Sequence, residues 1–208
     1  MGWTDTEQER LDLADFLEGL PPAAWDSMTP RHGWRVRDVA AHVIQGATQS
    51  RASTVVGLAG RGFRYNAYYD DTARENGCAD TETLVAGVRA AAPSRRHMLG
   101  LPGPASAAML AETFEHHQSL RHHLGEPRSI PPERLVIALD VAAGAGFPLG
   151  ARKRIAGLHL SATDVGWQTG DGPEVRGPAE QLFFAMLGRA EMVDRLDGDG
   201  WPELSTRL

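Results

Sequence analysis

The chain has 208 residues, a formal net charge of −6 from 21 basic and 27 acidic side chains, and 42% hydrophobic residues. This composition predicts a globular protein with one sizeable core, or a main domain of roughly 150 residues with a smaller second part. No basic run exceeds Arg152–Arg154 and no stretch of roughly 18 apolar residues occurs, so neither nucleic acid nor a membrane is an expected partner. We expect a cytoplasmic protein, because the acidic residues 1–20 do not resemble a targeting segment.

The cysteine content limits the chemistry that the chain can supply. Cys78 is the only cysteine, which excludes an internal disulfide and a cluster of thiolate ligands. A bound metal must therefore rely on His, Asp and Glu side chains. Cys78 has no histidine or basic neighbour in the sequence to lower its pKa, so we do not expect it to be a nucleophile. Thiol chemistry would need a thiol from a small molecule.

The first half of the chain predicts helices joined by short connections. Residues 5–19 carry apolar side chains at helical spacing and end at a glycine and two prolines. Residues 34–58 predict one long second helix, whose apolar stripe includes Val39 and Val43 and lies next to His42. Residues 60–77, rich in Gly and Tyr, are expected to be a connection without a helix.

Three more helices are predicted after this connection. Thr81 is the expected N-cap of the third helix, which Pro93 interrupts. Residues 106–124 form the fourth, which stops at Gly125. Residues 133–143 resume the helical pattern as the fifth.

The composition changes after residue 144. Residues 154–172 alternate apolar and polar side chains around Gly and Asp, which favours two short strands, and residues 178–187 predict a final helix. We therefore predict a helical domain over residues 1–146 and a small α/β domain over residues 150–208.

The fourth predicted helix carries the strongest chemical signal. Glu112 and His116 stand four residues apart, so they lie on one stripe of a helix, one turn from each other. A divalent metal can bridge such a pair, and His42 can supply a third ligand from the second predicted helix. Two imidazoles and one carboxylate suit Zn²⁺ best, although Fe²⁺, Ni²⁺ and Mn²⁺ accept the same set. A coordination position left open would make the site catalytic.

Several alternatives compete with this assignment. A histidine beside an apolar stripe is often a core residue without a ligand role. His123 lies one heptad after His116 and shares its face, whereas His117 and His122 point elsewhere and are expected to face solvent or a pocket mouth. We interpret Glu115 as a surface carboxylate or as a residue that contacts a metal ligand without binding the metal itself. The alternative is that Glu115 is a ligand in place of Glu112. Nothing in the sequence places the other histidines, His32, His97 and His159, at the site.

Three segments resemble one known family. WRVRDVAAH around His42, ETFEHHQSLRHHLG around Glu112 and His116, and SATDVGWQTGDGPEVRGPAEQLFFAMLGR near the end are similar to the mycothiol-dependent maleylpyruvate isomerase family of actinobacteria. The resemblance spans nearly the whole chain. It implies a mainly α fold, with a DinB-like four-helix bundle and a small α/β C-terminal part. It also implies that His42, Glu112 and His116 hold a divalent metal, usually zinc, and that mycothiol is the thiol cosubstrate.

The resemblance also implies a functional arginine, and the chain departs from the family pattern at one place. Gly188-Arg189 matches a family segment whose arginine acts at the active site, so Arg189 is the candidate catalytic residue for an anionic substrate or for the thiol, with Arg176 as a second candidate. Family members commonly show Gly-Trp-Asp where this chain has His117-Gln118-Ser119, so the family's substrate is not carried over.

The leading hypothesis is a metal-dependent enzyme that activates mycothiol for cis–trans isomerisation or thiol transfer on a small, anionic electrophile. Its expected partners are a small-molecule substrate and the thiol, and a homodimer is left open. One rival is a helical binding or regulatory protein that kept the fold without catalysis. Another is a metal-dependent hydrolase, in which water replaces the thiol.

Overall fold

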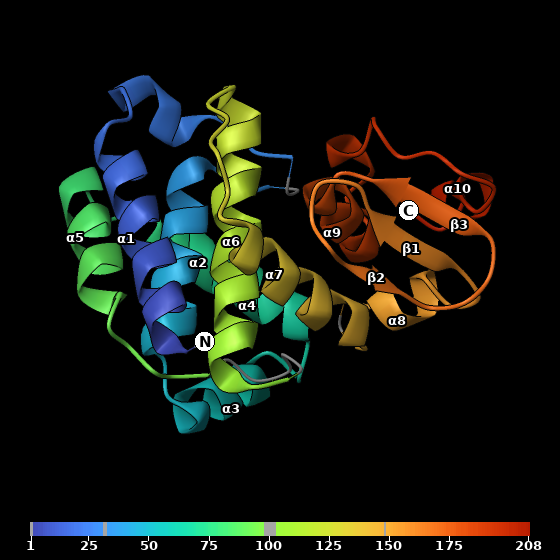
Figure 1. The fold of residues 1–208 in the computed structure, drawn as a ribbon. Helices are drawn as coiled ribbons and strands as arrows, with labels where there is room; N and C mark the ends of the chain where they lie inside the picture. The colour runs from blue at the N-terminus through green and yellow to red at the C-terminus, as the bar shows by residue number, and fades with distance from the viewer. Residues whose placement is uncertain (1, 31–32, 98–102, 148) are drawn as a thin grey trace. The chain divides into compact units, whose positions relative to one another are not determined.

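The computed structural model describes residues 2–30, 33–97, 103–147 and 149–208, and it is mainly α-helical (Figure 1). The elements of the first part of the chain are α1 (Trp3–Glu18), the 3-10 helix η1 (Pro22–Asp26), α2 (Val36–Thr48), α3 (Arg51–Gly60), α4 (Tyr65–Asn76), α5 (Thr81–Ala91) and α6 (Ala105–Leu124). Those of the second part are α7 (Pro132–Gly144), α8 (Ala151–Arg154), β1 (His159–Ala162), β2 (Gln168–Thr169), β3 (Glu174–Gly177), α9 (Ala179–Leu187), the 3-10 helix η2 (Ala190–Met192) and α10 (Trp201–Ser205). No helix among the described residues is long and apolar enough to span a membrane.

The chain divides into two compact units. The first comprises Met1–Leu99 and Glu112–Pro127, and the second comprises Gly100–Ala111 and Arg128–Leu208, each within the described residues. The helix α6 therefore contributes its C-terminal part to the first unit. The predicted domain ranges, 1–146 and 150–208, stay a prediction.

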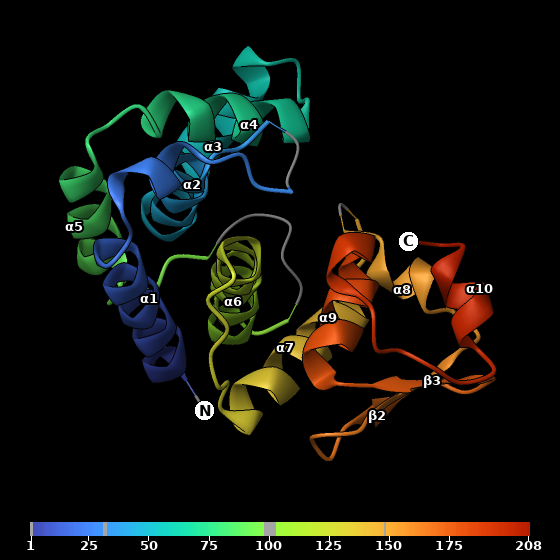
Figure 2. The same cartoon turned by 90° about the horizontal axis from the view of Figure 1, so that it is seen from above.

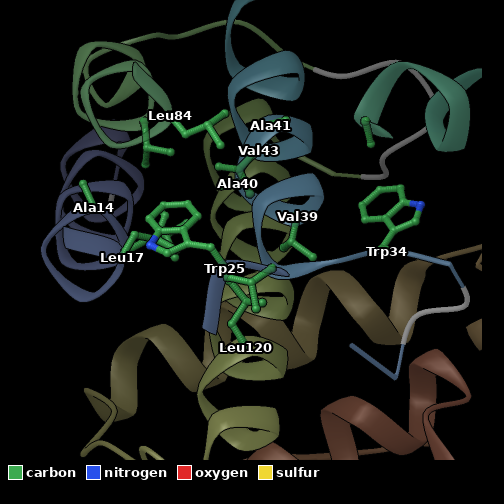
Figure 3. Close-up of a cluster of buried hydrophobic side chains, with 14 residues drawn as sticks. Ala14, Leu17, Trp25, Trp34, Val39, Ala40, Ala41, Val43, Leu84 and Leu120 are labelled. Atoms are coloured by element: carbon green, nitrogen blue, oxygen red, sulfur yellow. The ribbon is translucent and has the colours of Figure 1, made fainter. Parts of the chain in front are cut away.

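The first unit is a bundle in which α1 packs on α5, α5 on α2 and α2 on α4, as the end-on view of Figure 2 shows. Its core is a cluster of buried apolar side chains from α1, η1, α2, α4, α5 and α6 (Figure 3). Trp25 of η1 and Leu120 of α6 both belong to this cluster, together with Leu17 and Val39. The helices form because each presents one apolar stripe, and burial of these stripes stabilises the bundle. The predicted four-helix bundle is confirmed.

The predicted long helix over residues 34–58 is wrong in one respect, because it breaks into α2 and α3. The backbone of Gln49 and Ser50 is extended, and the Ser50 hydroxyl accepts a hydrogen bond at 3.1 Å from the backbone N–H of Ser53. A serine in this position caps a new helix and so competes with continuation of the old one. The apolar pattern alone did not show the break.

The connection predicted over residues 60–77 contains the helix α4. Tyr68, Tyr69 and Ala73 are buried on it. The sequence of this segment shows no clear apolar stripe, because the burial of its tyrosines and alanine depends on the packing of α4 against α2. The cap of α5 also differs from the prediction, since Asp80 accepts from the backbone N–H of Thr83 at 2.7 Å and Thr81 is the first helical residue.

The second unit contains a three-stranded sheet in the order β2-β1-β3, one strand more than predicted. β1 pairs antiparallel with β2 and parallel with β3. The apolar helix α9 packs on β1 and β3, and α10 packs on β3 (Figure 1). α9 ends at Gly188, whose φ of 76° is the left-handed conformation that glycine adopts without a Cβ clash. The predicted mainly α class with a small α/β part is confirmed.

Candidate metal centre

His42 is presented by the middle of α2, whose start is fixed by charged side chains. Asp38 accepts from the backbone N–H of Arg35 at 2.8 Å and from its guanidinium, which forms a capping box at the first turn. One turn after Asp38, His42 lies on the inner side of the helix, with 5% of its surface exposed. The local sequence therefore sets both where α2 begins and which residues face inward.

Glu112 and His116 come from α6, which is buried on almost all sides at this level. Glu112 is 8% exposed and His116 is 3% exposed, and Met109, Phe114 and Leu120 on the same helix are buried as well. Burial of an ionised carboxylate costs several kcal/mol unless a cation or hydrogen bonds compensate it. The position of Glu112 is thus one where a positive partner is needed.

The three predicted ligands lie together. One potential ligand atom from each of His42, Glu112 and His116 lies within 4.8 Å of the other two. Oε1 of Glu112 is 3.6 Å from Nε2 of His42 and 3.5 Å from Nε2 of His116. The carboxylate oxygen is therefore about equally far from the two imidazole nitrogens, which come from different helices.

These separations fit a metal ion better than direct hydrogen bonds. A hydrogen bond between such atoms is about 2.7–3.2 Å long. Ligand atoms placed 2.0–2.1 Å from a tetrahedral Zn²⁺ are about 3.3–3.4 Å apart, which is close to both observed distances. Across the described residues this is the one His/Cys/Asp/Glu group with such spacing. Three protein ligands leave a tetrahedral ion one position for an exogenous ligand.

Aromatic rings surround the imidazoles. The ring centroids of Trp34 and Tyr69 lie 4.8 Å and 5.5 Å from that of His42, and the Trp34 indole N–H donates to Asp70 at 3.0 Å. Burial, followed by the neighbouring tyrosines and the charge of Glu112, raises the pKa of Tyr69 far above its usual range. Tyr69 is therefore a neutral phenol at the edge of the site, and the rings keep bulk water from the imidazoles.

Glu115 contacts His116 on the side away from Glu112. Its Oε2 lies 3.4 Å from Nδ1 of His116, and the residue is 9% exposed. A carboxylate beside the other nitrogen of a ligating imidazole fixes the orientation and tautomer of the ring. This geometry agrees with the interpretation that Glu115 contacts the predicted ligand His116 without binding the metal itself.

The expectation that His117 faces solvent is wrong. His117 is completely buried, and its Nδ1 lies 2.8 Å from Oε1 of the equally buried Glu9. Arg121 donates from Nε to Nε2 of His117 at 2.8 Å, so the ring is neutral and Nδ1 donates to Glu9. α6 is surrounded at this level, so the face opposite the ligands is also buried.

The remaining histidines of α6 do not join the metal group. His122 is exposed, as expected, and Nε2 of His123 lies 3.2 Å from the hydroxyl of Ser27. His159 contacts the carbonyl of Gly170 through Nδ1 at 2.9 Å, in the second unit. His32 lies outside the described residues.

Arg10 is a charged residue near the centre that the sequence did not reveal. It is completely buried on α1, and its Nη1 donates to the carbonyls of Ala91, Ala92 and Ser94 beyond the end of α5. Burial lowers the pKa of Arg10, and the charge of Glu112 opposes this effect. A helical pattern with an arginine among apolar residues gave no signal that this side chain points inward.

Arg189 lies in the second unit, directly after Gly188 at the end of α9. Burial, and next the positive charge of Arg189, lower the pKa of Arg154, so the two guanidinium groups are close enough to repel each other. Arg176, the second candidate, is exposed and forms an ion pair with Asp197 at 2.6 Å.

A small pocket adjoins the predicted ligands. It is lined by polar side chains of α2, α3 and α4 and by His97, and it shares Tyr69 with the ring contacts of His42. The sequence offered no reason to place His97 here, because its loop follows α5 without a recognisable pattern. The pocket lies entirely within the first unit.

Comparison with known proteins points to one family. Residues 6–126 match the family described as Mycothiol maleylpyruvate isomerase N-terminal domain, and this range contains His42, Glu112 and His116. No curated protein sequence matches the chain. Two similar solved structures are the mycothiol-dependent maleylpyruvate isomerase and a histidine-to-alanine mutant of it. Each is 16% identical, with a TM-score of 0.47, and the match covers 96% of this chain and 95% of that chain.

Proposed function

Because this chain belongs to the mycothiol maleylpyruvate isomerase family, we propose that it is a metal-dependent enzyme that activates mycothiol for reaction with a small, anionic electrophile. The family match covers more than half of the chain and includes the whole candidate metal centre. Isomerisation of a cis double bond and transfer of the thiol are the two reactions that this chemistry allows.

One observation carries the proposal: Oε1 of Glu112 lies 3.6 Å and 3.5 Å from the Nε2 atoms of His42 and His116, inside the protein. The donor set is a buried carboxylate and two imidazoles, which suits Zn²⁺ and also accepts Fe²⁺, Ni²⁺ or Mn²⁺. Its single negative charge partly neutralises a divalent ion, so the centre keeps a net positive charge that attracts a thiolate.

The metal supplies one chemical effect: it lowers the pKa of a thiol that reaches the open position, so that thiolate forms at neutral pH. The protein supplies the rest. His42, Glu112 and His116 would hold the ion, Glu115 would orient His116, and the rings of Trp34 and Tyr69 limit access of water. Exclusion of water strengthens every electrostatic interaction in the site.

In the isomerase reaction the thiolate sulfur forms a bond to one carbon of the cis double bond, and the π electrons move to the neighbouring carbon. The remaining single bond rotates, and loss of the same thiolate restores the double bond as trans. In the transferase reaction the neighbouring carbon, which received the π electrons, takes up a proton and the sulfur stays attached. The two outcomes therefore differ in whether this carbon is protonated before the thiolate leaves.

We assign Arg189 the role of binding an anionic group of the substrate. The guanidinium of Arg189 is positively charged and can bind a carboxylate through two parallel hydrogen bonds. The Gly188-Arg189 pair in the family-like C-terminal segment supports the same assignment.

The test is a turnover assay on the zinc-loaded protein with a panel of cis-unsaturated diacids, including maleylpyruvate, and with mycothiol present or omitted. Proton NMR detects the trans isomer, and mass spectrometry detects a stable thiol adduct. We expect turnover only with the thiol, and its loss in His42→Ala. Products of bond cleavage by water that form without any thiol would instead support a hydrolase, and no turnover under any condition would support the binding-protein alternative.

A further inference from the structure

The polar pocket next to the metal centre is the feature that the proposed function leaves unexplained. Its cavity volume is about 10 Å³, which is room for one water-sized group. The pocket therefore suits a single small polar group of a larger molecule. Its lining residues are Gln45, Gly46, Gln49, Arg51, Thr54, Tyr69 and His97.

The pocket lies near the predicted ligand His42 along α2, and Tyr69 stands between them. His42, Gln45 and Gln49 occupy positions i, i+3 and i+7, which fall on one stripe of a helix. With a rise of 1.5 Å per residue, Gln45 and Gln49 stand about 4.5 Å and about 10 Å along the helix axis from His42. Tyr69 contacts the His42 ring and lines the pocket. One elongated molecule can therefore reach both places.

The buried wall of the pocket presents hydrogen-bond acceptors. Gln45 donates from Nε2 to Oε1 of Gln49 at 2.9 Å, and Gln49 donates in turn to the hydroxyl of Tyr68. These bonds hold the Gln45 amide in one orientation, and its buried Oε1 has no hydrogen-bond partner within the described residues. Gln45 is 5% exposed, so an oxygen without a partner there is costly.

Thr54 adds a second acceptor to the same wall. It is 5% exposed, and its hydroxyl donates to the carbonyl of Ser50 at 3.1 Å, which leaves its oxygen only able to accept. A carboxylate has no proton to donate to these two oxygens, and its attraction to Arg51, an exposed lining residue, leaves both of them unsatisfied. An amine cation would meet the guanidinium of Arg51, another lining residue. The matching ligand group is a neutral donor, namely a hydroxyl or an amide N–H.

We propose that this pocket binds a hydroxyl- or amide-bearing part of the thiol cosubstrate, while the sulfur of the same molecule reaches the metal. The inference rests on the proposed function. Mycothiol fits the requirement, because its sulfur is carried by an N-acylated cysteine attached to a polyhydroxylated glucosamine–inositol body. Gln45 and Thr54 thus select a glycosylated thiol over a simple one, and the acidic substrate binds elsewhere.

The test compares two thiols by isothermal titration calorimetry on the zinc-loaded full chain. Mycothiol carries the hydroxyl-rich body, and N-acetylcysteine lacks it. Gln45→Met and Thr54→Val each remove an acceptor at nearly constant volume. We expect each to weaken mycothiol binding about three- to tenfold, the effect of one lost neutral hydrogen bond, and to leave N-acetylcysteine binding within twofold of wild type. Thr72→Val is the matched control, since Thr72 lies on α4 and does not line the pocket.

Circular dichroism and zinc content establish that each variant is folded and metal-loaded. Unchanged mycothiol affinity in both variants overturns the inference, as does equal weakening of the two thiols, which would indicate an effect through the metal centre. The wild-type protein could turn over substrate with mycothiol while the ratio of mycothiol affinity to N-acetylcysteine affinity is the same in the variants as in wild type. In that case only the pocket assignment fails. If wild-type protein binds neither thiol, the proposed function fails as well.

Discussion

The carboxylate of Glu9 lies 2.8 Å from Nδ1 of His117, and neither side chain is exposed to solvent. The pair joins α1 to α6 at the residue that follows the predicted ligand His116. Arg121 donates to the other nitrogen of His117, so each polar atom of the imidazole has a partner. This contact holds the turn of α6 that presents the predicted ligand His116.

Replacement of Glu9 by Ala is expected to lower the free energy of unfolding by about 1–3 kcal/mol, because it leaves the buried Nδ1–H of His117 without its acceptor. Glu9→Gln should cost less, since its amide oxygen still accepts from Nδ1. Urea unfolding followed by circular dichroism measures both. His122→Ala, at an exposed position of the same helix, should change stability by less than about 0.5 kcal/mol. Equal stability of Glu9→Ala and wild type would refute the structural role.

Substitution of either imidazole ligand should remove the metal. We expect His42→Ala and His116→Ala to lose zinc on dialysis, because each leaves two protein ligands where a stable site needs three or more. Elemental analysis of the dialysed proteins gives the metal content per chain. His122→Ala is the control, because it removes a histidine that is not a predicted ligand and leaves both predicted imidazole ligands in place. Full zinc occupancy in both ligand variants would exclude this centre.

Glu115→Ala should weaken zinc binding without abolishing it. Its carboxylate lies 3.4 Å from Nδ1 of His116, and loss of a group that orients a ligand typically reduces metal affinity by about 10- to 100-fold. Competition with a chromophoric chelator measures the affinity, and Glu115→Gln should lose less than Glu115→Ala. If Glu115→Ala instead binds no zinc at saturation, Glu115 is itself a ligand.

Asp80 provides a pH-dependent contribution to the stability of α5. Hydrogen bonds from the side chain and backbone N–H of Thr83 lower the pKa of Asp80 below 3.8. A lowered folded-state pKa means that the stabilisation is complete above pH 3.8 and is lost as the pH falls through the lower value of the folded protein. The urea midpoints of wild type and Asp80→Ala should therefore differ at pH 7 and converge toward pH 2.

Asp80→Asn is the control, since its amide oxygen still accepts from Thr83 but does not titrate. The difference between wild type and Asp80→Asn should shrink in the same acidic range. A gap between wild type and Asp80→Ala that stays constant down to pH 2 would show that the ionised carboxylate has no part in capping α5.

Arg189→Ala should raise the KM for a dianionic substrate by about tenfold or more, because a hydrogen bond between charged groups is lost. Zinc content should not change. The dimethyl ester of the same substrate, which has no charge to bind, should show little difference between variant and wild type. Arg195→Ala, which removes an exposed guanidinium of the same unit, is the matched control. Equal losses for acid and ester would contradict a role in anion binding.

Short-range patterns in the sequence were enough to bring forward the three candidate ligands, which stay a prediction. Glu112 and His116 share a stripe through helical geometry alone, and His42 follows the apolar stripe of α2. The same reasoning failed for His117, which lies about 100° around α6 from its neighbour His116 and is also buried. A helix that is buried all round gives no polar face from which the inner side can be inferred.

The sequence by itself determined the mainly α class, the positions of most helices and the types of ligand available, because periodicity and side-chain chemistry act within a few residues. Only the tertiary structure decided that α4 is a buried helix, that Glu9 and Arg10 face inward, and that Gln45 faces a pocket. It also decided that Oε1 of Glu112 lies about equally far from the Nε2 atoms of His42 and His116, two residues that are distant in the sequence. Contacts between distant segments depend on how whole helix faces pack together, and this information is spread over every residue of the core.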